Sequence, residues 1–219
     1  WHHCPRTIVC CEGRRLKRLE WYSLYKANRP EKPADAVEAL VEIINDLADA
    51  GVPLVALDGY EADDLIATFC QQAGDEPVQI FSRDKDLYQL LSPTVSVVSD
   101  GKVITVADCE TKFGVRPDQV RDFLALWGDA SDNIPGCPGI GEGKAASLLQ
   151  HFGTLESARQ QPDWRLKAAG LGDKTIAKFR AWAPALALRL TSLLYDAPIH
   201  INDIIKPIES DPMADMTKI

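Results

Sequence analysis

Seven carboxylates in three short clusters constrain this sequence more than any other feature. Each cluster follows an apolar stretch, so the acidic side chains are expected at the ends of buried elements, where they repel one another. Folding tolerates such crowding when a cation lies between the oxygens, and hard divalent ions with oxygen ligands are the usual occupants. This many ligands provides for two ions, and two-ion sites are typical of phosphodiester chemistry. The candidate metal ligands are Glu61, Asp63, Asp64, Asp84, Asp86, Asp129 and Asp132.

Length and composition indicate an ordinary globular protein, which we expect in the cytoplasm. The chain has 219 residues, of which 46% are hydrophobic and 26% charged, enough for a substantial core. No apolar run approaches the roughly 20 residues of a membrane helix. The start does not resemble a secretory signal either, so we expect no membrane partner. Because the chain starts with Trp1 instead of Met, we interpret it as a fragment, a trimmed chain or the product of a disturbed gene start.

The six cysteines lack the density and spacing of a disulfide framework, so reduced thiols are expected. His2, His3, Cys4 and Cys10 carry zinc-ligating side chains near the start of the chain. Their spacing matches no standard zinc site, which makes zinc binding there the weaker interpretation.

A basic segment precedes an acidic remainder. Residues 1–32 hold eight Lys and Arg and three acidic residues, a net charge of +5, whereas the other 16 basic and 29 acidic residues give −13, for −8 in all. A basic segment beside an acidic, metal-binding centre suits an enzyme that acts on a polyanion. The alternative is a solvated charged face, which is the commoner meaning of a single charge run.

Strands and helices alternate in the first half of the chain. Helical spacing of apolar residues predicts helices over residues 34–50 and 61–73, and short buried runs predict strands over 54–57 and 78–81. Apolar runs on both sides of Asp100-Gly101 predict a hairpin. Such alternation predicts an α/β fold with a mostly parallel sheet, in which ligands bind at the carboxyl ends of the strands. The acidic residues that follow these strands are Glu61, Asp63, Asp64, Asp84 and Asp86.

The second half of the chain is expected to be helical. We therefore predict a core over residues 1–115, a helical lobe over 116–200 and a weakly patterned tail over 201–219. A helix is also expected through Leu87 to Leu91. The other predicted helices span about 107–113, 117–127, 142–152, 173–182 and 184–195.

Each acidic cluster has an alternative interpretation when it is taken alone. Acidic residues in a first helical turn are common caps, an Asp after a strand is often a turn residue, and the loop 128–136 reads as a polar turn. Three such clusters in one α/β chain favour a metal site.

A glycine-rich turn runs from Pro138 to Lys144 and leads directly into a helix. Closely spaced glycines before a helix let backbone N–H groups approach a phosphate. The turn is not a P-loop, because Pro138 replaces the first Gly and Ala145 replaces the Ser or Thr. A hairpin that grips a nucleic-acid backbone fits better, and a tight interhelical turn that needs glycine for packing is the alternative.

Lys26 and Arg29 stand three residues apart, a spacing at which both side chains face the same way on a helical turn and can hold one phosphate. Exposed basic residues before a proline are frequent, so this signal is weak by itself.

Five segments resemble the bacterial 5′-nuclease family, which includes the 5′–3′ exonuclease domain of DNA polymerase I and the flap endonucleases. The resemblance covers about residues 20–195 in unbroken order. The segments are Tyr-Lys-Ala-Asn-Arg-Pro at 25–30, Glu-Ala-Asp-Asp at 61–64, Ser-Arg-Asp-Lys-Asp-Leu-Tyr-Gln-Leu-Leu at 82–91, Phe-Leu-Ala-Leu-Trp-Gly-Asp-Ala-Ser-Asp-Asn-Ile-Pro-Gly at 123–136 and Gly-Ile-Gly-Glu-Gly-Lys-Ala at 139–145.

The resemblance implies a PIN-like core with a helix–hairpin–helix lobe. It implies that the seven carboxylates surround two Mg²⁺ ions, for which Mn²⁺ can substitute, and that Lys26 and Arg29 steady the scissile phosphate. It also implies DNA as the partner, as a 5′ flap or a nicked or gapped duplex, with a polymerase domain or protein as a further partner. Some family members bind K⁺ at the hairpin. The implied DNA-binding residues are Tyr25, Gly139, Ile140, Gly141, Gly143 and Lys144.

The implied function is Mg²⁺-dependent 5′–3′ exonuclease and flap endonuclease activity by a two-metal mechanism. Family members begin with a strand that ends in an Asp ligand, which this sequence lacks, and Glu12 is the acidic residue nearest to a second expected Asp. The alternative is therefore a catalytically impaired module that binds DNA structures. A PIN-type ribonuclease is a third reading, but it has no need of the lobe around Gly139 to Lys144.

Overall fold

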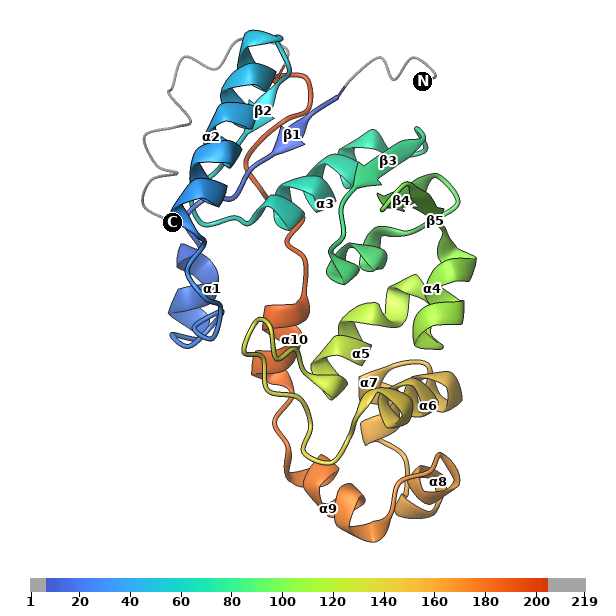
Figure 1. The fold of residues 1–219 in the computed structure, drawn as a ribbon. Helices are drawn as coiled ribbons and strands as arrows, with labels where there is room; N and C mark the ends of the chain where they lie inside the picture. The colour runs from blue at the N-terminus through green and yellow to red at the C-terminus, as the bar shows by residue number, and fades with distance from the viewer. Residues whose placement is uncertain (1–6, 205–219) are drawn as a thin grey trace. The chain divides into compact units, whose positions relative to one another are not determined.

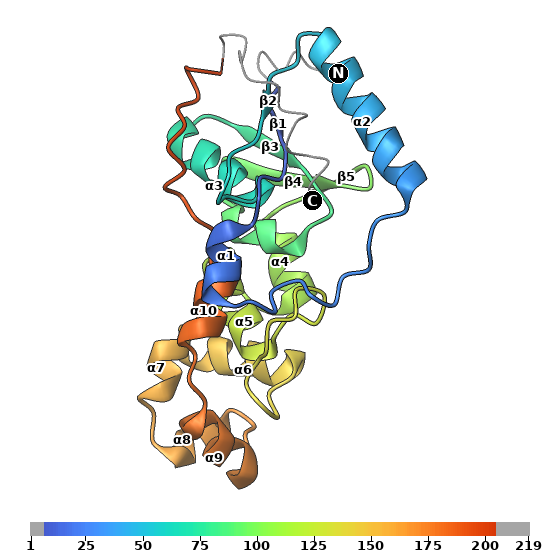
Figure 2. The same ribbon diagram turned by 90° about the vertical axis from the view of Figure 1, so that its left-hand side faces the viewer.

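Residues 7–204 are described by the computed structural model in Figures 1 and 2. His2, His3 and Cys4 of the zinc interpretation, and the tail from residue 205, lie outside the described residues. Within the described range, contacts divide the chain into two units. The first comprises residues 7–20, 29–74 and 194–204, and the second comprises Trp21–Asn28 and Asp75–Leu193.

The first unit contains a two-stranded parallel sheet. The apolar run before Glu12 forms β1 (Val9–Cys10), which pairs with β2 (Leu54–Val55) so that Val9 lies opposite Leu54. The predicted strand at 54–57 is confirmed, although its regular part is shorter. The helices of this part of the chain are α1 (Leu16–Trp21), which was not predicted, α2 (Ala34–Asp49) and α3 (Ala62–Ala73).

Helix α3 turns one face into the core of the first unit. Leu65 and Phe69 are buried with Val55 of β2, and Ala197 of the returning chain packs in the same cluster. Tyr60 joins this cluster, and its hydroxyl donates a hydrogen bond to the carbonyl of Asp196 at 3.0 Å. The segment before α3 is thereby held against the segment after residue 194.

The second unit contains β3 (Val78–Phe81), β4 (Val95–Ser99) and β5 (Lys102–Ile104) in that order. β3 and β4 are parallel, whereas β4 and β5 form the predicted antiparallel hairpin. Asp100 and Gly101 have φ values of 50° and 76°, the left-handed conformations that a two-residue hairpin turn requires.

Helices follow the sheet of the second unit, as predicted, and α8 and α9 lie beyond α6, away from β3–β5 in both views (Figures 1 and 2). Residues 117–127 divide into a 3₁₀ turn and an α-helix, and the helix expected through Leu87–Leu91 is a 3₁₀-helix. α7 and α8 were not predicted. The elements are η1 (Lys85–Leu90), α4 (Val106–Phe113), η2 (Pro117–Gln119), α5 (Val120–Trp127), α6 (Glu142–Phe152), α7 (Leu155–Arg159), α8 (Asp163–Ala168), α9 (Asp173–Ala181) and α10 (Ala185–Thr191).

The contact-based units do not coincide with the predicted boundary at residue 115, because the sheet β3–β5 and the helices after it share one unit. The division into a core, a lobe and a tail therefore stays a prediction. Among residues 7–204, no helix is long and apolar enough to cross a membrane. The described cysteines are free thiols, as expected, namely Cys10, Cys11, Cys70, Cys109 and Cys137.

Gly13 generates a prediction because the backbone of the first unit passes close to it. A Cβ atom at this position would lie 2.1 Å from the carbonyl oxygen of Leu57. We expect Gly13→Ala to lower the free energy of unfolding by about 1–3 kcal/mol, the typical cost of overpacking. Gly143→Ala is the matched control, since a Cβ there meets no atom within 4 Å and the residue lies inside α6. Urea denaturation should show the control at or above wild-type stability; equal stability of both variants would contradict the prediction.

Candidate functional site

Asp84 and Asp86 lie at the start of η1, directly after strand β3. Asp84 is the N-cap of this 3₁₀-helix, and its carboxylate accepts a hydrogen bond from the backbone N–H of Asp86 at 2.9 Å. The amide of Asp84 donates to the hydroxyl of Ser82 at 3.0 Å. Both carboxylates thus follow the carboxyl end of β3, which is where the sequence predicted them.

Asp129 begins a loop that closes on itself. Its backbone pairs with that of Ile134 through hydrogen bonds of 2.9 and 2.7 Å. Gly128 and Gly136 cross at the base of the loop, where a Cβ on Gly136 would lie 2.3 Å from the carbonyl oxygen of Trp127. The loop is therefore held by its own backbone, which keeps Asp129 and Asp132 at defined positions.

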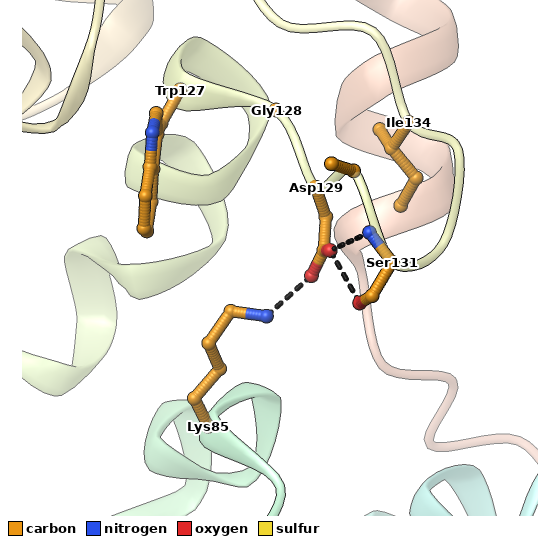
Figure 3. Close-up of a pocket in the computed structure, with 7 residues that line it drawn as sticks. Lys85, Trp127, Gly128, Asp129, Ser131 and Ile134 are labelled. Carbon is orange, nitrogen blue, oxygen red and sulfur yellow. Dashed lines mark hydrogen bonds and ion pairs between the residues drawn. The ribbon is translucent and has the colours of Figure 1, made fainter.

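Lys85 is the cation that the structure places against these carboxylates. Its Nζ donates a hydrogen bond to Oδ2 of Asp129 and lies 3.7 Å from Oδ1 of Asp86. The other oxygen of Asp129 accepts bonds from the amide and hydroxyl of Ser131 at 2.9 and 2.6 Å. Lys85, Asp129 and Ser131 line a cavity of about 400 Å³. Figure 3 shows the bonds of Asp129 to Lys85 and Ser131, with Trp127 and Ile134 on opposite sides of Asp129.

The electrostatics of this group show four carboxylates within reach of one another. Burial raises the pKa of Asp86 to about 7, and the negative charges of Asp84, Asp129 and Asp132 add to this rise against the opposing effect of Lys85. Burial alone would lower the pKa of Lys85, but its hydrogen bond to Asp129 and the surrounding carboxylates raise it. The pKa of Asp129 is lowered, because bonds from Lys85 and Ser131 outweigh the effect of its burial.

The donors of this group are carboxylate oxygens, which are the kind of ligand that a divalent cation takes. Oδ1 of Asp86 is buried and accepts no hydrogen bond from any described residue, and the repulsion at Asp86 is what an additional positive charge would relieve. Within residues 7–204, no three Asp, Glu, His or Cys side chains lie closely enough together to hold an ion. The ammonium of Lys85 lies against two of these carboxylates, Asp86 and Asp129.

The segment Trp21–Asn28 packs against the same loop. Tyr25 is 4% exposed and packs with Ala125 and Ile134, and its hydroxyl donates to Oδ2 of Asp132 at 3.1 Å. The amide of Lys26 donates to the carbonyl of Asp132 at 2.9 Å, and its Nζ lies 3.8 Å from Oδ2 of that residue. Tyr25 was expected on DNA, but its burial directs the side chain to Asp132.

Lys26 has a φ of 57°, an uncommon conformation for a residue with a long side chain. The predicted helical turn through Lys26 and Arg29 is therefore wrong, because a left-handed residue interrupts it. Asn133 also has a positive φ, of 56°, and its side chain bonds Asn28 at 3.0 Å and the Leu24 carbonyl at 2.7 Å. Such conformations persist where their surroundings hold them, often at functional sites.

In the first unit, the carboxylate of Asp64 is completely enclosed. Its oxygens accept bonds from Arg18 at 2.5 and 2.8 Å, from the amide of Glu61 at 3.0 Å and from the amide of Leu194 at 2.9 Å. Two carboxylate oxygens offer about four acceptor positions, and protein donors take all of them. We therefore expect Asp64 to position Arg18 and Glu61, not to contact an ion as the sequence suggested.

Glu61 and Asp63 lie beside this ion pair. Glu61 is the N-cap of α3 and forms a capping box with Asp64, so the capping role weighed for this cluster is present in the structure. Oε2 of Glu61 lies 3.5 Å from Nε of Arg18. Burial raises the pKa of Cys10 to about 12, with smaller contributions from Cys11, Cys70 and Asp63. Asp63 thus lies near the end of β1, the strand that Glu12 follows.

The glycine turn before α6 has an open outer face. Gly141 is the N-cap of this helix, and Gly141, Gly143 and Lys144 are exposed. The ammonium of Lys144 donates to the carbonyl of Gly139 at 3.1 Å. Ile140, in contrast, is buried, so its side chain packs inward and leaves its neighbours to meet a ligand.

The structure therefore brings Asp84, Asp86, Asp129 and Asp132 together in the second unit, and Glu61, Asp63 and Asp64 together in the first. Sequence reasoning missed the counter-ions Arg18 and Lys85. Lys85 stands between two predicted ligands and could have been noticed for that reason, but nothing near Arg18 in the sequence indicates a partner 46 positions away.

Comparisons with known proteins show the family of the chain. The sequence profile of the N-terminal resolvase-like domain of 5′-3′ exonucleases matches residues 2–114, and that of the C-terminal SAM fold of 5′-3′ exonucleases matches residues 115–210. The α/β fold with a following helical segment, predicted from the sequence, is thereby confirmed.

Relatives of known sequence are polymerases and exonucleases. The chain is 40% identical to the thermostable DNA polymerase I of Thermus aquaticus, with 89% of this chain and 23% of the relative covered. It is 39% identical to the 5′-3′ exonuclease of Aquifex aeolicus, with 69% and 54% covered. The chain thus spans about a quarter of the polymerase and about half of the exonuclease.

A solved structure of similar fold is the flap endonuclease of bacteriophage T5 in a pseudo-enzyme–product complex with DNA and metal ions. It has a TM-score of 0.69 and 26% sequence identity, and the match covers 87% of this chain and 74% of the other.

The enclosed ion pair of Arg18 and Asp64 generates a stability prediction. Arg18→Met leaves a buried carboxylate without its partner, and we expect the free energy of unfolding to fall by about 3–5 kcal/mol. Arg116→Met is the matched control, because Arg116 and Asp118 form an ion pair with side chains 55% and 69% exposed, and such pairs contribute about 0–1 kcal/mol. Urea midpoints that fall equally in both variants would show that enclosure of Asp64 is unimportant.

The raised pKa of Asp86 generates a prediction in metal-free buffer. A carboxyl whose pKa is about 7 when folded and 3.8 otherwise destabilises the fold when ionised, so the destabilisation is full above pH 7 and disappears towards pH 4. At pH 8 in EDTA, we expect Asp86→Asn to increase the free energy of unfolding by at most about 4 kcal/mol. The melting temperature should rise accordingly. The gain should vanish at pH 4; a gain that is independent of pH would contradict the assignment.

Proposed function

The chain belongs to the 5′-3′ exonuclease family, and from that premise we propose that it hydrolyses DNA phosphodiesters at 5′ ends or 5′ flaps with Mg²⁺ as cofactor. The observation that carries the proposal is the group of Asp84, Asp86, Asp129 and Asp132, in which a buried carboxylate has a pKa raised by its neighbours. The T5 flap endonuclease, solved with DNA and metal ions, supports DNA and metal ions as ligands.

Asp84, Asp86, Asp129 and Asp132 would hold the cation in the second unit. Divalent ions supply a nucleophilic water and stabilise charge on phosphoryl oxygens. Two further points stay predictions. Glu61 and Asp63 contribute ligands to a second ion, and Mn²⁺ can substitute for Mg²⁺. Asp64 acts in this proposal through its bonds to Arg18 and Glu61.

The basic side chains of the chain bind and orient the phosphate. Lys26, which lies beside Asp132, and Arg29 offset negative charge on the scissile group. Tyr25 acts as a positioning residue, because its hydroxyl fixes one oxygen of Asp132. The backbone of Lys26 is left-handed, and its amine lies 3.8 Å from Oδ2 of Asp132 in the acidic loop.

The exposed turn at Gly139, Gly141, Gly143 and Lys144 is proposed to grip the DNA backbone as a hairpin, with K⁺ as an optional ligand. A Cβ on Gly141 or Gly143 would meet no atom within 4 Å, so space for a phosphate is open there. Contacts of this kind do not read base sequence and weaken steeply with salt. A polymerase is proposed as partner, since the relatives include DNA polymerase I.

Asp84→Asn tests the proposed function. Asn is an N-cap of similar quality, so η1 should fold, whereas loss of one charge weakens the hold on the cation. We expect cleavage of a 5′-flap substrate in Mg²⁺ to fall by about a hundredfold or more, with duplex binding in Ca²⁺ retained. Asp118→Asn, at an exposed position on η2, is the matched control and should cleave normally.

Two other outcomes would redirect the proposal. Unchanged cleavage by Asp84→Asn would remove this residue from the site. Binding of the flap by the wild-type chain without cleavage at any Mg²⁺ concentration would favour the non-catalytic module that binds DNA structures.

A further inference from the structure

Arg18 and Lys85 each lie against buried carboxylates, but the two side chains are bound in different ways. Arg18 is 4% exposed and grips both oxygens of Asp64 with its planar fork. Lys85 is 30% exposed and donates a hydrogen bond to a single oxygen of Asp129. Arg18 is therefore enclosed by the fold, whereas Lys85 is held by one hydrogen bond at the edge of a cavity.

We propose that Lys85 is an exchangeable counter-ion, whose ammonium neutralises Asp86 and Asp129 in the metal-free protein and is displaced when a divalent ion binds there. This inference rests on the proposed function in one respect, namely that a divalent ion binds at these carboxylates. The role that it adds is that of Lys85.

The ammonium and an ion require the same oxygens. One oxygen of Asp129 is occupied by Ser131, which leaves the oxygen that Lys85 contacts as the one available to a cation. Oδ1 of Asp86 is buried, lies 3.7 Å from Nζ and accepts no hydrogen bond from any described residue. A cation that joins these two carboxylates would therefore lie directly beside the ammonium, and the repulsion between the two positive charges favours departure of the ammonium.

The surroundings of Lys85 allow it to leave. The cavity beside it has a volume of about 400 Å³ and is bordered by Trp127 and by the Asp129–Ser131 turn (Figure 3). A lysine ammonium is a compact charge on a flexible stem, and rotation of the stem moves it without disturbing the backbone. The bidentate guanidinium of Arg18 has no such freedom, because both of its bonds must break together.

Exchange of this kind gives the protein a defined metal-free state. The ammonium offsets repulsion among the carboxylates until a divalent ion arrives, and the affinity for that ion is reduced by the bond that must be broken. Lys85 would thus set the concentration at which the site fills.

Calorimetric titration of the full chain with MgCl₂, without DNA, tests the proposal. We expect Lys85→Met to bind Mg²⁺ about fivefold more tightly than wild type, the factor that matches a partly exposed ion pair. In EDTA, the same variant should melt about 2–4 °C lower. Lys85→Arg keeps the charge and should bind no more tightly than wild type. The matched control is Lys102→Met, at an exposed position on β5, which should change neither value.

A second measurement uses the unaltered protein, in case Lys85→Met does not fold. Reductive methylation with formaldehyde and a borane, read by mass spectrometry, reports how accessible each amine is. We expect Lys85 to be modified faster in Mg²⁺ than in EDTA, while Lys102 reacts equally in both.

The outcomes separate this proposal from the proposed function. Wild-type Mg²⁺ binding with equal affinity in Lys85→Met, or Lys85 methylation unchanged by Mg²⁺, overturns the exchange and leaves the nuclease proposal standing. Absence of any Mg²⁺ binding by the wild type overturns both the exchange and the metal site.

Discussion

Repulsion between buried carboxylates is the constraint on which the structure depends. Glu61 and Asp64 stand at one helix start, and Asp86 and Asp129 belong to two elements that meet in the second unit. Burial of such groups without positive charge is costly. Basic side chains lie against the carboxylates in both places, Arg18 in the first unit and Lys85 and Lys26 in the second, and they offset part of this repulsion.

Arg18 and Lys85 bind their carboxylates in chemically different ways. The carboxylate of Asp64 accepts two bonds from the fork of Arg18 and one each from the amides of Glu61 and Leu194, which ties together α1, the start of α3 and the chain at Leu194. A lysine with one bond contributes less rigidity and leaves one oxygen of Asp86 without a donor from the described residues. The carboxylate of Asp64 is thus fully hydrogen-bonded, whereas a buried oxygen of Asp86 accepts no hydrogen bond from the described residues.

Sequence patterns predicted the elements that depend on residues close together in the chain. The long amphipathic helices and the Asp100-Gly101 hairpin follow from periodicity and turn chemistry, and they were predicted. α7 and α8 were missed, because five or six residues are too few to show a period. Contacts distant in sequence were also missed: neither the fork of Arg18 on Asp64 nor the burial of Tyr25 against Asp132 leaves a mark on neighbouring residues. Tertiary partners decide those roles.

The attachment of Trp21–Asn28 to the loop at Asp132 and Asn133 joins positions more than a hundred residues apart, 107 for Tyr25 and Asp132. A contact between residues so far apart in sequence forms only after the later residues have been synthesised. On the ribosome, where chains grow at roughly 5–20 residues per second, the early segment must wait several seconds for its partner. The amine of Lys26 and the carboxylate of Asp132 therefore cannot meet before Asp132 has been translated, and until then the nascent chain lacks this contact.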